Sequence, residues 1–129
     1  MSTDASTGDR ILIQVQTAWL PDHSAPDEAR FAFAYTITIE NAGDTAAQLI
    51  SRHWIISDAN GVEQEVQGDG VIGEQPRLAP GESFRYTSGA VIRTPVGSMR
   101  GTYHMEKDDG SRFEAPIPPF TLARPGTLN

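Results

Sequence analysis

The chain has 129 residues with 10 Lys and Arg against 17 Asp and Glu, so its formal net charge is −7 and its length predicts one domain. The absence of cysteine excludes disulfide frameworks and thiol nucleophiles, and the acidic balance argues against nucleic-acid binding, which depends on clustered Lys and Arg. Without a signal peptide or a run of ~20 apolar residues, the chain is expected to be cytoplasmic and to have no membrane span.

Period-two alternation of apolar and polar residues dominates the sequence and predicts strands rather than helices. It is clearest over residues 31–39, where aromatic and isoleucine side chains alternate with alanine and threonine. The predicted strands cover residues 11–15, 31–39, 49–57, 62–66, 84–91, 99–105 and 113–117. Asn60-Gly61 and Asp109-Gly110 are typical of tight hairpin turns. Seven strands in a chain of this length predict an all-β antiparallel sandwich of the immunoglobulin or fibronectin type III kind, with Trp54 in its core.

The predicted sandwich is a single domain over residues 10–123, between a flexible N-terminal tail at 1–9 and a C-terminal tail at 124–129. If each strand reverses direction, the connections 41–46, 67–82 and 107–111 gather at one end. Because these connections carry more Asp and Glu than Lys and Arg, that end is expected to be acidic.

One loop carries a glycine motif: Gly68, Gly70 and Gly73 match G-x-G-x-x-G. In dinucleotide-binding proteins these glycines bring backbone N–H groups to a pyrophosphate at the start of a helix. Here Pro80 falls within the helix that the motif requires, and the loop is acidic. The favoured interpretation is a long irregular loop that uses glycines for positive φ angles. Phosphate binding by the three glycines with Arg77 is the alternative.

The sequence shows no strong pattern of metal-binding or catalytic residues. His23, His53 and His104 lack the spacing of metal ligands, so no metal site, cofactor or catalytic residue is predicted, although the acidic loops could hold a divalent cation weakly. Apolar residues outside the strand pattern either pack under the end of the sandwich or form a partner surface, and the sequence favours neither. These are Val71 and Ile72 in the glycine loop, and Phe120 after the double proline of the last strand.

Several segments, read together, resemble the ApaG domain family. They are Ser51-Arg52-His53-Trp54, the glycine loop 68–76, Tyr86-Thr87-Ser88-Gly89, residues 94–103 and Ile117-Pro118-Pro119-Phe120, and they span about residues 10–123 in order. The resemblance implies a fibronectin type III-like sandwich in a small bacterial protein whose loss is associated with altered cobalt and magnesium tolerance and efflux. It also implies a protein-interaction module without established catalytic residues. The family's suggested pyrophosphate contact corresponds here to Gly68, Gly70 and Gly73.

Two functional hypotheses follow. The first is a non-enzymatic protein-interaction module that affects divalent-cation homeostasis through an unidentified protein partner. The alternative is a small-ligand sensor, in which the glycine loop binds a polyphosphate or nucleotide, with a divalent cation bridging phosphate to the acidic loops.

Overall fold

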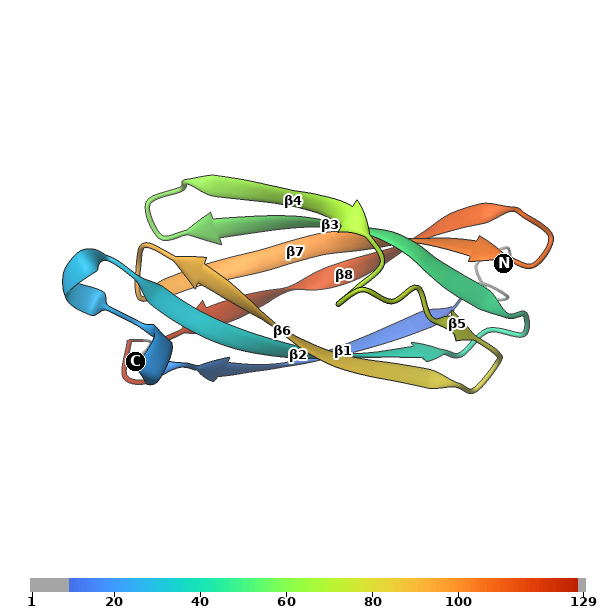
Figure 1. The fold of residues 1–129 in the computed structure, drawn as a ribbon, viewed down its shortest axis with the longest axis horizontal. Helices are drawn as coiled ribbons and strands as arrows, with labels where there is room; N and C mark the ends of the chain where they lie inside the picture. The colour runs from blue at the N-terminus through green and yellow to red at the C-terminus, as the bar shows by residue number, and fades with distance from the viewer. Residues whose placement is uncertain (1–9, 128–129) are drawn as a thin grey trace, which may run out of the picture.

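The computed structural model describes residues 10–127, which form two antiparallel sheets packed face to face (Figure 1). One sheet has the strand order β1-β2-β6, and the other has the order β4-β3-β7-β8, with the short β5 also paired to β3. The strands are β1 (Ile11–Trp19), β2 (Phe31–Asn41), β3 (Ala47–Asp58), β4 (Glu63–Asp69), β5 (Arg77–Leu78), β6 (Ser83–Ile92), β7 (Val96–Lys107) and β8 (Arg112–Ala123). The predicted all-β sandwich is confirmed.

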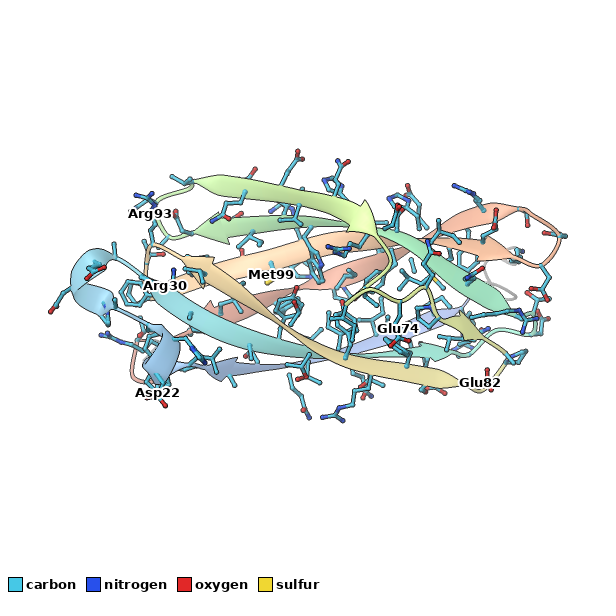
Figure 2. The ribbon with its side chains drawn as sticks, in the orientation of Figure 1. Asp22, Arg30, Glu74, Glu82, Arg93 and Met99 are labelled. Carbon is cyan, nitrogen blue, oxygen red and sulfur yellow. The ribbon has the colours of Figure 1, made fainter. Side chains whose placement is uncertain are left out.

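The alternation in the sequence places one face of each strand in the core. In β2, Phe33, Ile37 and Ile39 are at most 1% exposed, whereas Thr36 and Thr38 between them are partly exposed. Burying one such Phe or Ile side chain contributes about 1.5–3 kcal/mol, so β2 alone supplies much of the driving force for sheet packing. Figure 2 shows the core side chains lying between the two layers.

An aromatic cluster around Trp54 fills the centre of the sandwich. Its indole lies 5.4 Å from the ring of Tyr35 on β2 and 5.9 Å from that of Phe120 on β8, both in T-shaped geometry. Edge-to-face contacts of this kind add to the stabilisation from buried area, because the positive edge of one ring faces the negative face of another. The predicted core position of Trp54 is therefore confirmed, and Phe120 belongs to the same cluster.

Both predicted hairpin turns form. Asp58 Oδ1 accepts hydrogen bonds from the N–H groups of Asn60 and Val62, and Gly61 takes a φ of +83° in the turn before β4. Asp109 Oδ1 accepts from the N–H of Ser111 in the turn before β8. Side chains of Asp that bond to the following backbone stabilise such turns locally.

The structure adds elements that the sequence pattern does not reveal. β5 has two residues and follows a proline, which is too short for alternation to be visible. Two 3-10 turns, Pro21–His23 and Pro26–Glu28, connect β1 to β2, and each begins with a proline. Of the predicted tails, 1–9 lies outside the described residues. At the C-terminal end, the residue after β8 is still hydrogen-bonded to the sandwich: the Arg124 N–H donates to Pro95 O at 2.9 Å.

Of the three connections expected at one end of the sandwich, 41–46 and 107–111 lie there with the Gly81–Glu82 part of the third, whereas residues 70–76 run along the open side, where Figure 2 places Glu74 (Figures 1 and 2). The Asn41 N–H donates to Glu82 O at 2.9 Å, and the Gly81 N–H donates to Asn41 O at 2.7 Å. Arg77, from the 67–82 connection, forms an ion pair with Asp108 from the turn between β7 and β8. Strand reversal therefore predicted where the chain turns at this end, but not that residues 70–76 fold back along the open side.

The two sides of the sandwich are closed differently. On one side β1 lies beside β8, so the edges of the two sheets meet. On the other side the edges are β4 and β6, each hydrogen-bonded to a single neighbouring strand. The segment that connects β4 to β5 lies between these two edges in Figure 1 and covers this open side.

A buried hydrogen bond joins the sheets near the open side. Tyr86 Oη on β6 and Tyr103 Oη on β7 are 2.5 Å apart, and the two residues are 5% and 0% exposed. Burial raises the pKa of both hydroxyl groups well above the ordinary tyrosine value, so the pair is neutral. Because both hydroxyl groups are buried away from water, each has the other as its hydrogen-bond partner.

Replacing both tyrosines by phenylalanine is expected to cost less than the sum of the two single replacements. Tyr103→Phe leaves the Tyr86 hydroxyl buried without a partner, which lowers the free energy of unfolding by about 1–3 kcal/mol. In Tyr86→Phe/Tyr103→Phe no hydroxyl is orphaned, so the loss should be smaller than the sum of the two single losses. Urea unfolding of the four proteins measures this coupling. Thr87→Val is the control, because its 2.7 Å bond to Thr36 is exposed and its loss should change stability by less than about 0.5 kcal/mol. Additive single losses would contradict the interpretation.

Candidate functional site

The glycine loop begins in β4 and ends at β5. Gly68 is paired with Arg52 inside the β3–β4 ladder, whereas residues 70–76 leave the ladder and cover the open side of the sandwich. The pairing of β3 with β7 shifts between Leu49 and Ser51, which marks a β-bulge at Ile50. Ile50 O accepts hydrogen bonds from the Gly70 N–H at 2.8 Å and from Gln75 Nε2 at 2.9 Å. The bulge thus anchors the loop at both ends.

Arg52 also holds the loop in place. Its Nη1 donates to Asp69 O at 3.1 Å and to Gly70 O at 2.8 Å. The guanidinium passes over Gly68, where an added Cβ would lie 2.9 Å from Nη1. A Cβ at position 68 would displace the guanidinium, so Gly68 lets Arg52 keep its bonds to the loop carbonyls.

The centre of the loop is a two-residue β-hairpin. The Val71 N–H donates to Glu74 O at 2.8 Å, and the Glu74 N–H donates to Val71 O at 2.9 Å. Between them Ile72 and Gly73 have φ angles of +44° and +81°, as in a type I′ turn. Gly70 has a φ of +62°, and a Cβ there would lie 2.3 Å from Glu74 O. The favoured interpretation of the glycines, a loop that needs positive φ angles, matches this geometry.

The hydrogen bonds of the glycine loop give little support to the hypothesis that it binds phosphate. The N–H groups of Gly70, Val71 and Glu74 are all used within the protein, as described above. Arg77 does not lie free for an anion, because its Nε is 3.0 Å from Asp108 Oδ1. This hydrogen bond is also the main cause that lowers the pKa of Asp108 below its ordinary value. Ligand binding at the loop stays a prediction.

The three residues expected on a partner surface have different environments. Val71 is 1% exposed and belongs to the core, which corrects the expectation for this residue: the hairpin turns its side chain inward to close the open side. Phe120 is partly buried against Trp54 and Tyr35. Ile72, at the tip of the turn, is 55% exposed. Of the three, Ile72 is the one presented to solvent.

A polar pocket of about 390 Å³, which the sequence pattern did not indicate, lies at the β3–β4 and β3–β7 pairings. It is lined by Ser51, Arg52, His53, Gln67, Gly68, Asp69 and His104. His53 Nε2 lies 3.3 Å from Glu65 Oε2, and His104 Nδ1 lies 3.7 Å from Glu114 Oε2. Within residues 10–127 no group of three or more His, Asp or Glu side chains is placed to hold a metal ion. Only the strand register, which alternation does not reveal, brings the two histidines onto neighbouring strands.

Alanine substitutions at Gly70 and Gly73 should lower the free energy of unfolding by different amounts, because the two positions have different surroundings. Gly73→Ala meets no atom within 4 Å, so it carries only the left-handed penalty of about 1–2 kcal/mol. Gly70→Ala carries the same penalty and also drives a Cβ into Glu74 O, so its loss of unfolding free energy should be clearly larger. Chemical denaturation, with circular dichroism to verify the fold, gives both values. Equal losses would contradict this account of the loop.

No helix in the described part of the chain is long and apolar enough to span a membrane. The family model described as "ApaG domain" matches residues 21–107. The chain is 59% identical to Protein ApaG of Thiobacillus denitrificans over 120 residues, covering 93% of this chain and 94% of that protein. It is 56% identical to Protein ApaG of Pseudomonas aeruginosa over 125 residues, covering 97% and 99%.

The fold comparison agrees with the sequence comparison. The crystal structure of a Bordetella pertussis protein named ApaA superposes with a TM-score of 0.88 at 50% identity, covering 92% of this chain and 96% of that one. The likeness thus extends over nearly the whole sandwich, including the glycine loop within the matched range. This chain belongs to the ApaG domain family.

Proposed function

We propose that the chain is a non-enzymatic protein-interaction module whose contact residue at the glycine loop is Ile72. The observation that carries this proposal is the conformation of that residue. Ile72 has a φ of +44° although it is β-branched, and its side chain is 55% exposed. A bulky residue in the left-handed region is a strained outlier that costs on the order of 1–3 kcal/mol.

Folding gives no compensation for this strain at Ile72 itself, because the exposed side chain gains little from burial in the free protein. Asn or Gly at the same place would satisfy the turn without strain. An exposed apolar side chain held rigidly by a two-residue turn is suited to insertion into an apolar pocket of another protein. We therefore interpret Ile72 as a residue that serves a partner rather than the fold.

The titratable groups also support a non-enzymatic role. Strongly perturbed pKa values gather at catalytic sites, but here the shifted groups have structural partners. Tyr86 and Tyr103 are buried against each other, and Asp108 is paired with Arg77 at the exposed loop end. In this proposal the family's association with cobalt and magnesium tolerance and efflux reflects the effect of a partner protein, with no metal bound at a dedicated site.

Ile72→Asn should separate stability from binding. Asn tolerates the left-handed conformation, so the free energy of unfolding should rise by about 1 kcal/mol. At the same time, proteins captured by the immobilised chain from a bacterial lysate should be lost. Leu12→Asn is the matched control, since Leu12 is 44% exposed on β1 of the other sheet. Capture that survives Ile72→Asn, or that is lost equally with Leu12→Asn, would count against the proposed contact.

The ligand-sensor alternative is tested separately by amide chemical shifts. Mg²⁺, Co²⁺, pyrophosphate and ATP are added singly and in combination to the labelled chain. We expect no saturable shift at residues 68–77, because the N–H groups of Gly70, Val71 and Glu74 and the side chain of Arg77 are engaged within the protein. Saturable shifts confined to those residues would instead identify the loop as a small-ligand site and overturn the interaction proposal.

A further inference from the structure

β4 presents an uncovered backbone edge. It pairs with β3 and with no other strand of the described chain. The Gly70 N–H donates to Ile50 O, and the Asp58 N–H donates to Val62 O, which fixes the alternation of bonded and non-bonded pairs along the ladder. The N–H and C=O groups of Glu63, Glu65 and Gln67 consequently point away from β3. No other described group is hydrogen-bonded to them.

The edges of β8 and β6 each carry a feature that β4 lacks. β8 contains Pro116, Pro118 and Pro119, and proline cannot donate to an added strand. β6 carries the basic residue Arg85, and its Val91 O accepts one hydrogen bond from Gln64 Nε2 at 3.5 Å. β4 itself has neither proline nor a basic residue, and its register with β3 is unbroken.

The side chains of β4 alternate between two chemistries. Trp54, opposite Val66, points into the core, so even-numbered residues of β4 lie on the inner side. On that side, Val62 just before β4 and Val66 within it are 56% and 37% exposed. The outer side carries three carboxylates, Glu63, Glu65 and Asp69.

The outer row keeps its negative character despite internal ion pairs. Glu63 Oε2 lies 3.2 Å from Arg100 Nη2, and Glu65 Oε2 lies 3.3 Å from His53 Nε2. Three carboxylates therefore face one arginine and one histidine. A strand added beside β4 would place alternate side chains next to this acidic row and next to the two valines.

We propose that β4 binds an extended segment of a partner protein as an added antiparallel strand, in which basic residues alternate with apolar ones. The inference deepens the proposed interaction function and rests on it. The basic residues would lie beside Glu63 and Glu65, and the apolar residues beside Val66. A second copy of this chain fits poorly, because two antiparallel β4 strands would place carboxylates opposite carboxylates. The backbone supplies affinity in this mode of recognition, and the alternate side chains supply specificity.

A short capped peptide of alternating Lys and Val is the probe, titrated into the isotope-labelled chain at low salt. Amide shifts should saturate at Glu63, Glu65 and Gln67, and hydrogen exchange of these amides should slow. In antiparallel pairing the lysine backbone groups face β4. N-methylation of the lysine nitrogens should therefore abolish binding, whereas N-methylation of the valine nitrogens should spare it. The analogue with Glu in place of Lys should bind at least about tenfold more weakly.

Variants of the chain test the same edge. Glu65→Pro removes an outward N–H while the ladder to β3 is kept, so the fold should survive and peptide binding should be lost. Glu63→Lys/Glu65→Lys should weaken binding by about tenfold or more through charge alone. Glu114→Lys is the matched control: it reverses a charge on β8 and should leave the affinity within about twofold.

Each result decides the proposal. Lysine-peptide binding that survives lysine N-methylation, shifts that map to β6, or no saturable shift up to millimolar peptide would overturn strand addition at β4. These failures are distinguishable from failure of the proposed function. If a captured partner depends on Ile72 but is unaffected by Glu65→Pro, the interaction module stands and the β4 edge is excluded as its binding site.

Discussion

Closure of the open side of the sandwich is the constraint on which the rest of this structure depends. β1 and β8 meet on one side, but β4 and β6 leave the core without a covering strand on the other. The chain solves this by folding residues 70–76 inward and burying Val71 at 1% exposure. The loop is held by Ile50 O at the bulge and by the two bonds of Arg52 to loop carbonyls. Core packing, rather than ligand geometry, accounts for these contacts.

That closure determines the backbone of the glycine motif. To turn Val71 inward within a two-residue hairpin, the chain needs positive φ angles at Gly70, Ile72 and Gly73. Glycine meets two of these requirements without cost. At Ile72 the chain carries an apolar, β-branched residue where its conformation is unfavourable and its side chain is exposed. The fold gains little from that choice, and this strain is the observation from which we propose that Ile72 contacts a partner.

Period-two alternation was sufficient to predict the sandwich and the core position of Trp54, and strand reversal predicted the end at which the connections 41–46 and 107–111 meet. It could not predict β5, whose two residues are too few to show a pattern, nor the inward turn of Val71, which depends on long-range closure. Phe120 looked like a surface residue because it follows two prolines, yet the register shift between Ile117 and Phe120 in the pairing with β7 turns it toward Trp54. The grouping of His53 and His104 depends on strand register, which alternation leaves open.

The same closure explains why the two edges of the larger sheet differ. β8 ends the sheet where β1 lies beside it, and its three prolines remove donors from the edge that faces away from β7. β4 ends the sheet at the open side, where the loop covers the core but not the strand itself. The N–H groups of Glu63, Glu65 and Gln67 point away from β3. Proline at these positions would therefore keep the pairing with β3, yet β4 has none. An edge left unprotected beside an acidic row therefore admits basic strands and repels acidic ones, including a second copy of itself.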